Sequence, residues 1–404
     1  MNRNRNKNSK MRNRDRQRII KTGVCFFLLL CLTGCWSARE VNDLEIVIGV
    51  GVDKSDIPDN IRFTAQIVKP GEMRQPAQEG GGGSGTAFWN VQSTEASLFN
   101  TVRDITHKTG NRLFLSHSQL VVFENEIAAE GIEKYMDFFL RTHEMRPTAL
   151  ILIANGTAED ILNIKPEKEK LPAMHIAKLI NAYGFTSHFV KMNLQDFSTL
   201  MMSKTSSPMA PLVEISQDAG KRDFSFCGLA VFKNFKMVGA LNRDEARGLL
   251  WVTGKVKSGV INVTGPGGQG MVVLEILKAK SKVTPQFREG KLYMHIEVKE
   301  EASITEQLTE ESLVTFPALE LLQEKQEEII RGEITAAFEK SKELGADVFG
   351  FGELVHKKYR SEWKQMEQDW DSVYKSIELL VDVETRIVKT DLITKPAVPE
   401  KGEE

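Results

Sequence analysis

The stretch LYMHIEVK, at Leu292–Lys299, alternates strictly between apolar and polar side chains. A strand has this period of two when one of its faces is buried and the other meets water. Two nearby segments, Val260–Val263 and Met271–Lys280, are also rich in apolar and β-branched residues, which favour strands. Three strands that follow one another in the sequence predict an antiparallel sheet in the last third of the chain.

The residues after these strands predict helices packed on the sheet. An amphipathic helix is expected from about Pro317 to Leu344, and Gly345 is placed to end it. Asp347 is placed to cap the next helix. A closing antiparallel strand is predicted at Ile377–Lys389, where apolar and charged residues alternate. We therefore expect residues 256–394 to form an antiparallel sheet covered by helices on one face.

Two further mixed units are predicted before this one. The first, 35–160, contains a flexible glycine-rich loop at 70–86 that is too poor in apolar side chains to fold alone. The second, 165–255, begins after a charged break. The predicted strands are Ile46–Val52, Ile61–Ile67, Gln119–Phe123, Ala149–Ala154, Phe226–Phe232 and Met237–Leu241, and the predicted helices are Ser93–Lys108 (capped by Ser93), Ile127–Leu140, Ala173–Tyr183 and Arg243–Trp251. The predicted fold class is α+β, with three consecutive mixed α/β domains and a disordered tail at 395–404.

The N-terminus has the pattern of a bacterial lipoprotein signal peptide. A basic start leads into the apolar run Val24–Leu32, which is followed by Thr33, Gly34 and Cys35. This pattern predicts that residues 1–34 are removed between Gly34 and Cys35. Cys35 would then carry an S-diacylglycerol group and an N-acyl chain such as palmitate. The alternative is an uncleaved membrane anchor, but the apolar run is far shorter than the ~20 residues that span a bilayer.

The charge of the chain is unevenly placed. Residues 1–34 carry nine Lys or Arg and one Asp, although the whole chain has a net charge of −2, so the part from Cys35 onward is strongly acidic. A basic N-terminal arm that binds nucleic acid is the alternative to a discarded leader. We expect no nucleic-acid partner, because the mature chain lacks a basic excess with which to neutralise phosphates.

No pattern in the sequence predicts catalysis, a metal or a cofactor. After removal of the leader, Cys227 is the one cysteine besides Cys35, so no intrachain disulfide can form, and its apolar surroundings favour a buried side chain over a nucleophile. The seven histidines show no zinc-binding spacing. We therefore expect a protein that is not an enzyme.

Two glycine-rich segments share some features with phosphate-binding loops. The segment GPGGQG at Gly265–Gly270 matches a dinucleotide-binding motif, but the following residues favour a strand where that motif needs a helix, so a hairpin loop is favoured. The run Gly80–Gly85 lacks the Lys-Ser/Thr end of a phosphate-cradling loop and has no strand leading directly into it.

Several blocks of the sequence resemble the Ger(x)C spore-germination lipoproteins, the C subunits of nutrient germinant receptors of spore-forming bacteria. The resemblance covers nearly the whole mature chain. The matching blocks are LTGCWSARE at Leu32–Glu40, NDL at Asn42–Leu44, Ile46–Asp53, FFLR at Phe138–Arg141, GLAVFK at Gly228–Lys233, DVFGFGE at Asp347–Glu353, Tyr359, and Glu362 with Trp363. The long arginine-rich leader and the Gly80–Gly85 run depart from the family pattern, and Met1 and Met11 both remain candidate starts.

The resemblance implies a function that composition does not supply. It implies a non-enzymatic subunit that is anchored by lipid on Cys35 to the outer surface of the spore inner membrane. It implies two integral-membrane partners, the A and B receptor subunits, with which the protein would trigger germination. It leaves direct contact with the nutrient open.

Two alternatives stay open beside this resemblance. A solute-binding lipoprotein of a transporter is the second hypothesis, although such proteins usually have two similar α/β lobes with parallel sheets. Separately, Phe349, Phe351 and Trp363 are interpreted either as an exposed docking surface or as core residues. Aromatic residues beside glycines favour the core, because glycine permits close packing.

Overall fold

The computed structural model describes residues 21–23, 43–73, 86–142, 144–218, 220–309, 312–313 and 315–389. The chain separates into two compact units, Met1–Leu44 and Glu45–Glu404, and the sheets and helices named below belong to the second, apart from Leu44 at the start of the first strand. The predicted lipidation site at Cys35, the predicted cleavage site after Gly34, residues 74–85 of the predicted loop and the tail at 395–404 lie outside the described residues.

One mixed sheet of nine strands has the order β3-β2-β1-β5-β6-β7-β8-β9, with β4 paired to β1 beside this path. Its strands are β1 (Leu44–Lys54), β2 (Ile61–Val68), β3 (Phe88–Glu95), β4 (Arg112–Phe114), β5 (Leu120–Glu124), β6 (Leu150–Ala154), β7 (Met209–Asp218), β8 (Lys221–Lys233) and β9 (Lys236–Leu241). β1, β5, β6 and β7 run parallel, and antiparallel strands continue the sheet on either side. Every residue of β5 and β6 is buried, as expected for central parallel strands that are covered on both faces.

The helices associated with this sheet are mostly short. They are α2 (Pro70–Met73), α3 (Leu98–Thr109), α4 (Asn125–Glu130), α5 (Glu133–Arg141), α6 (Ala158–Asn163), α7 (Pro172–Asn181), α8 (Leu194–Met201) and α9 (Arg243–Val252), with 3₁₀ turns η2 (Leu115–His117) and η3 (Tyr183–Phe185). The single helix predicted over Ile127–Leu140 is wrong, because Gly131 ends α4 at a φ of 127°, a conformation that glycine adopts without strain. The cap predicted at Ser93 is also wrong: Ser93 lies in β3, and Ser97 caps α3.

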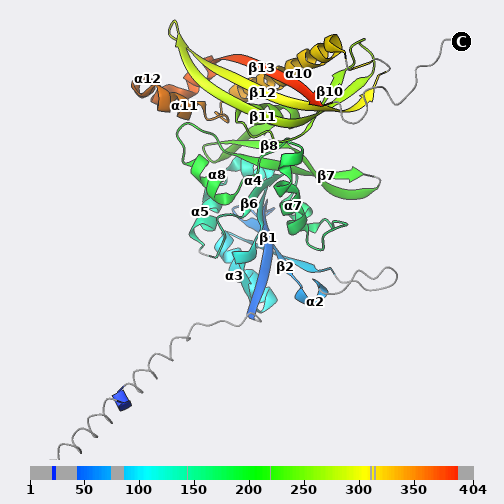
Figure 1. Cartoon of the computed structure of the whole chain (residues 1–404). Coiled ribbons are helices and arrows are strands. Elements are labelled where there is room, and N and C mark those ends of the chain that lie inside the picture. The colour runs from blue at the N-terminus through cyan, green and yellow to red at the C-terminus, as the bar shows by residue number, and fades with distance from the viewer. Residues whose placement is uncertain are drawn as a thin grey trace, which may run out of the picture. The chain divides into compact units, whose positions relative to one another are not determined.

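A second sheet contains four strands in the order β10-β11-β12-β13. Its strands are β10 (Val260–Thr264), β11 (Met271–Arg288), β12 (Lys291–Leu308) and β13 (Glu378–Lys389), and its helices are α10 (Phe316–Leu344), α11 (Phe351–Lys358), α12 (Arg360–Met366) and α13 (Trp370–Ser376), with a 3₁₀ turn η4 (Glu367–Asp369). Helix α10 lies along one face of the sheet (Figure 1). The predicted fold class is thereby confirmed, including the amphipathic helix that Gly345 ends in a left-handed conformation.

One feature of the second sheet differs from the prediction. β10, β11 and β12 are antiparallel neighbours, but β13 runs parallel to β12. A parallel neighbour requires a crossover connection of a dozen or more residues. The helices α10–α13 supply that connection and return the chain to the end of the sheet at which β12 began. The alternation at Ile377–Lys389 identified the strand and its buried face, but alternation carries no information on direction.

The first sheet continues through the predicted boundary at 160–165. Ile153 and Ala154 at the end of β6 pair with Leu212 and Val213 of β7. The strands expected in 35–160 and those expected in 165–255 therefore share one sheet. The division of the chain into three domains stays a prediction.

Candidate functional site

The described residues contain little that suggests catalysis. Among them, no three His, Cys, Asp or Glu side chains gather in a way that would hold a metal ion. In the same part of the chain, no helix is long and apolar enough to cross a membrane. Cys227 is half-buried, and burial raises the pKa of its thiol to about 11, which leaves the thiol protonated at neutral pH. Gly265–Gly270 forms the loop between β10 and β11, which confirms the hairpin interpretation.

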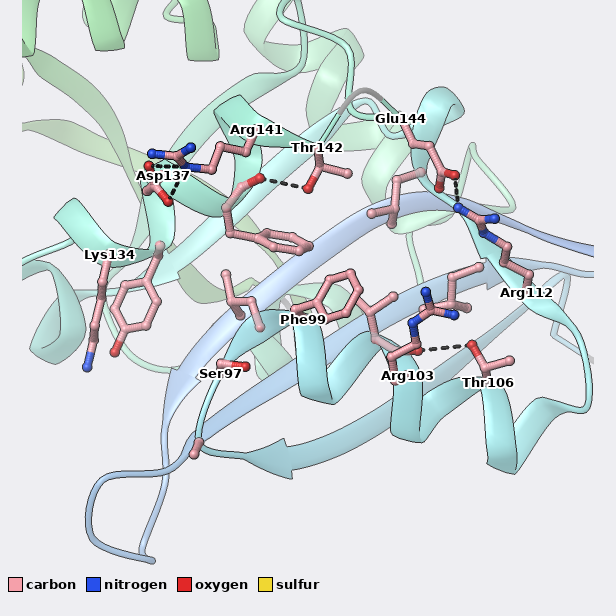
Figure 2. Close-up of a pocket in the computed structure, with 17 residues that line it drawn as sticks. Ser97, Phe99, Arg103, Thr106, Arg112, Lys134, Asp137, Arg141, Thr142 and Glu144 are labelled. Atoms are coloured by element: carbon pink, nitrogen blue, oxygen red, sulfur yellow. Dashed lines mark hydrogen bonds and ion pairs between the residues drawn. The ribbon is translucent and has the colours of Figure 1, made fainter.

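A hollow of about 700 Å³ lies between α3 and α5. We call it the α3–α5 groove. Its apolar lining includes Phe99 and Val102 from α3, Tyr135 and Phe138 from α5, and Leu113 and Leu115 between them in the sequence. Figure 2 shows Phe99 and Arg103 rising from α3 toward α5. The groove is therefore built by two helices over an apolar floor.

The rim of the groove is mainly basic. Arg103, Arg112, Lys134 and Arg141 line it, against the two carboxylates of Asp137 and Glu144. Arg141 Nε donates to Asp137 Oδ1 at 2.7 Å, and Arg112 is paired with Glu144. The Arg103 guanidinium lies 5.1 Å from the centre of the Phe99 ring, and Lys134 Nζ lies 4.9 Å from the centre of the Tyr135 ring.

A second candidate region surrounds the Asp347–Glu353 block. The Asp347 carboxylate accepts hydrogen bonds from the backbone N–H of Phe351 at 3.0 Å and of Gly352 at 2.8 Å. Asp347 thus caps α11, as predicted, although Gly350 is the residue that directly precedes the helix. Burial raises the pKa of Asp347 to about 6, while the N–H donors act in the opposite direction.

The two glycines of this block permit a close contact with the loop before β7. A Cβ built on Gly352 would lie 2.7 Å from Thr205 Cβ and 2.9 Å from the Trp370 ring. The same loop donates from Ser207 N to the Asp347 carbonyl oxygen at 2.8 Å. β7 is a strand of the first sheet. The block therefore connects the loop before β7 to the helices that pack on the second sheet.

The aromatic residues of the block belong to the core. Phe349, Phe351 and Trp363 are 8%, 0% and 3% exposed, which confirms the core interpretation over the docking interpretation. The Phe349 and Phe351 rings stack at 5.0 Å, and Tyr374 packs beside them. The block thus has a structural role that needs no ligand, because it holds the loop before β7 against α11.

A buried ion pair that no sequence pattern predicts also links α9, which follows the first sheet, to α10, which lies on the second sheet. Arg247 of α9 donates from Nε to Glu333 Oε2 of α10 at 2.9 Å, and Trp251 Nε1 donates to the same oxygen at 2.9 Å. Arg247 Nη1 donates to the Val260 carbonyl oxygen at 3.0 Å. A charged residue among the apolar positions of each amphipathic helix was the available signal, but nothing in the sequence showed that the two charges meet.

Comparisons with known proteins assign the family. The model described as "Spore germination protein N-terminal domain" matches residues 37–215. The model described as "Spore germination B3/ GerAC like, C-terminal" matches residues 227–391. Together the two models cover most of the chain and include the α3–α5 groove, the Asp347–Glu353 block and the Arg247–Glu333 pair.

Curated relatives match over nearly their whole length. "Spore germination protein KC" of Bacillus subtilis (strain 168) is 29% identical over 391 residues, which cover 91% of this chain and 95% of that protein. "Spore germination protein B3" of the same organism is 23% identical, over 93% of this chain and 99% of that protein.

A solved structure has the same fold. The crystal structure of the GerBC protein matches with a TM-score of 0.57 and 19% identity, over 84% of this chain and 97% of that chain. The two family models in order, the relatives matched over nearly their whole length and the shared fold all indicate the same family. The chain belongs to the GerAC family of spore germination proteins.

Proposed function

We propose that this protein is a non-enzymatic, lipid-anchored subunit of a spore nutrient germinant receptor. The observation that carries the proposal is the match to both family domains in order, at 37–215 and 227–391. Two integral-membrane subunits, A and B, are the partners that the receptor would need.

Lipid on Cys35 is the proposed tether. The first family domain begins at residue 37, directly after the lipidation motif, so a cleaved chain would place that domain close to the membrane surface. Two acyl chains suffice for stable anchoring, whereas one alone binds only weakly. The proposed location is the outer surface of the spore inner membrane.

The solute-binding hypothesis receives less support. Proteins of that class usually have two similar lobes with parallel sheets. The described residues of this chain instead form one mixed nine-stranded sheet and a separate four-stranded sheet of different topology.

The proposal is tested with spores that lack this protein. Release of dipicolinic acid is measured after exposure to a panel of amino acids and sugars, and after a non-nutrient trigger such as a cationic surfactant. We expect loss of the response to some nutrients and an unchanged response to the non-nutrient trigger. An unchanged response to every nutrient, in a strain from which other receptors have been deleted, would contradict the proposal.

The anchor is tested separately with Cys35→Ala, and Cys31→Ala in the leader is the matched control. We expect the first variant to leave the membrane fraction or to keep an unprocessed leader, and the second to fractionate like the parent. A processed Cys35→Ala protein that remains with membranes would show that lipid is not the main tether.

A further inference from the structure

We propose that the α3–α5 groove is a docking site for an amphipathic helix of a partner protein, with an apolar stripe flanked by acidic side chains. This inference rests on the proposed function only for the identity of the partner, which would be another subunit of the receptor. The site itself rests on the groove's exposed apolar residues, its shape and its charge.

The first argument is the exposure of apolar surface at a concave place. Phe99 is 55% exposed and lines the groove, while Leu113 and Leu115 below it are each 1% exposed. Single exposed apolar residues are common on protein surfaces, but an apolar hollow with an exposed aromatic ring at its edge is typical of an interaction site. Leu140 of α5 is 54% exposed but does not line the groove, so it provides a matched control.

The second argument is shape. α3 has 12 residues and α5 has 9, which correspond to lengths of roughly 14 to 18 Å at 1.5 Å per residue. Flanking helices of that length match about three turns of a third helix, since one turn rises about 5.4 Å. A helix that lays its apolar face between two others is a recurrent mode of recognition.

The third argument is charge. The lining contains four basic side chains and two acidic ones. Because Asp137 and Glu144 are already paired with Arg141 and Arg112, the surplus positive charge resides on Arg103 and Lys134. Among the described residues, neither of these two forms an ion pair, and each lies over an aromatic ring at the groove. A complementary partner therefore carries acidic residues beside its apolar stripe.

Segments of the chain itself fit the groove poorly. The apolar run Val24–Leu32 follows a basic block, which the basic rim would repel. The C-terminal residues 390–404 contain Pro396 and Pro399, and their sequence lacks the apolar pattern of an amphipathic helix of three turns. A flat lipid surface cannot enter a hollow between two helices, whereas a helix from another protein can.

Binding is measured with the purified lipidated protein in nanodiscs of phosphatidylcholine. The probe is a fluorescent 14-residue helical peptide with leucines at i, i+3, i+4 and i+7, flanked by glutamates. The control peptide has lysines in place of the glutamates. We expect the acidic peptide to bind and the basic one to bind at least roughly tenfold more weakly. Phe99→Ala should weaken binding of the acidic peptide by roughly tenfold or more, as an aromatic anchor does, and Leu140→Ala should leave it unchanged.

Either of two results would overturn the docking site: equal binding of the two peptides, or equal binding to the parent and Phe99→Ala proteins. Preferential binding of the parent to vesicles that contain anionic phosphatidylglycerol, lost in Phe99→Ala, would assign the groove to lipid and would also overturn the proposal. Because Phe99 is more than half exposed, both alanine variants should keep the parental circular dichroism and unfolding midpoint.

A spore assay separates this inference from the proposed function. If deletion of the protein abolishes a nutrient response, Phe99→Ala should weaken that response and Leu140→Ala should not. A full response of Phe99→Ala spores would overturn the groove proposal while the receptor function stands. A deletion without any effect would count against the receptor function, and peptide binding alone would then decide the groove.

Discussion

Arg247 on α9 and Glu333 on α10 form a buried ion pair that links the helix after the first sheet to the long helix on the second. Their side chains are 9% and 8% exposed, and Arg247 donates from both Nε and Nη2 to the Glu333 carboxylate. A paired arrangement of this kind satisfies a planar carboxylate with two parallel donors. The two sequence-distant helices are thereby held in one orientation.

Replacing one residue of this ion pair should lower the free energy of unfolding. Arg247→Leu leaves the Glu333 carboxylate buried with Trp251 as its remaining side-chain donor. We expect a loss of about 3 kcal/mol in the free energy of unfolding, because an uncompensated buried charge costs ~3–5 kcal/mol. Urea denaturation measures this loss. The double variant Arg247→Leu with Glu333→Leu should recover part of it, and a double variant as unstable as the sum of its single variants would show that the two residues are not coupled.

The crossing of the same two helices depends on Gly248. A Cβ built on this residue would lie 2.0 Å from the Glu333 carbonyl oxygen and 2.9 Å from Ala337 Cβ. We expect Gly248→Ala to destabilise the protein by more than about 2 kcal/mol, since overpacking typically costs ~1–3 kcal/mol and here the obstacle is backbone.

Gly332 on α10 provides the matched control for that substitution. It is exposed, lies inside the helix, and has no atom within 4 Å of a built Cβ. Gly332→Ala should therefore raise stability by up to ~1 kcal/mol, the difference in helix propensity between the two residues. Equal effects of the two substitutions in thermal unfolding would contradict the close crossing.

Glu300 should make the stability of the protein depend on pH. It is 2% exposed on β12, and burial raises the pKa of its carboxyl to about 8. Its Oε2 accepts from Gln326 Nε2 at 2.9 Å, whereas Glu300 Oε1 and Gln326 Oε1 have no hydrogen-bond partner among the described residues. A proton on Glu300 allows it to donate, so the neutral form suits this site.

The raised pKa of Glu300 determines how stability changes with pH. The unfolded chain loses the proton near pH 4.5, but the folded chain keeps it up to about pH 8, so the unfolded state gains stability as the pH rises between these values. Glu300→Gln, which is neutral throughout, should match the parent near pH 4 and exceed its stability at pH 8 by on the order of 4 kcal/mol, since one unit of pKa corresponds to ~1.4 kcal/mol. Unfolding midpoints that differ by a constant amount from pH 4 to 8 would contradict a protonated Glu300.

Local patterns in the sequence predicted local structure well. The alternation at Leu292–Lys299 and the amphipathic pattern at Pro317–Leu344 correspond to β12 and α10, because burial of one face imposes those periods directly. Hydrophobic periodicity continues across Gly131, so the break between α4 and α5 required knowledge of a backbone angle. The parallel direction of β13 depends on where α10–α13 return the chain, which no single segment encodes.

The candidate sites were harder to foresee, since each depends on contacts between distant segments. Phe99 and Phe138 lie in segments whose sequence indicates only ordinary helices. The groove that they line forms only when α3 and α5 lie beside each other. The aromatic block at Asp347–Glu353 was assigned to the core because glycines adjoin it, and that physical argument was sufficient. Lipidation of Cys35 stays a prediction, since it rests on a sequence motif that lies outside the described residues.

The last prediction concerns the joint at Gly352, whose missing side chain makes room for Thr205 and Trp370. Gly352→Ala should push the loop before β7 away from α11, because Thr205 Cβ lies 2.7 Å from the built Cβ. Lys204 in that loop is 80% exposed at its side chain and ion-paired with Glu367, so trypsin cleavage after Lys204 reports on the loop's mobility. We expect faster cleavage in Gly352→Ala than in the parent, and no change in the control Glu353→Ala on the adjacent exposed position. If cleavage after Lys204 is equally slow in all three proteins, the loop does not depend on this glycine, and the contact would be a consequence of the fold and not a support for it.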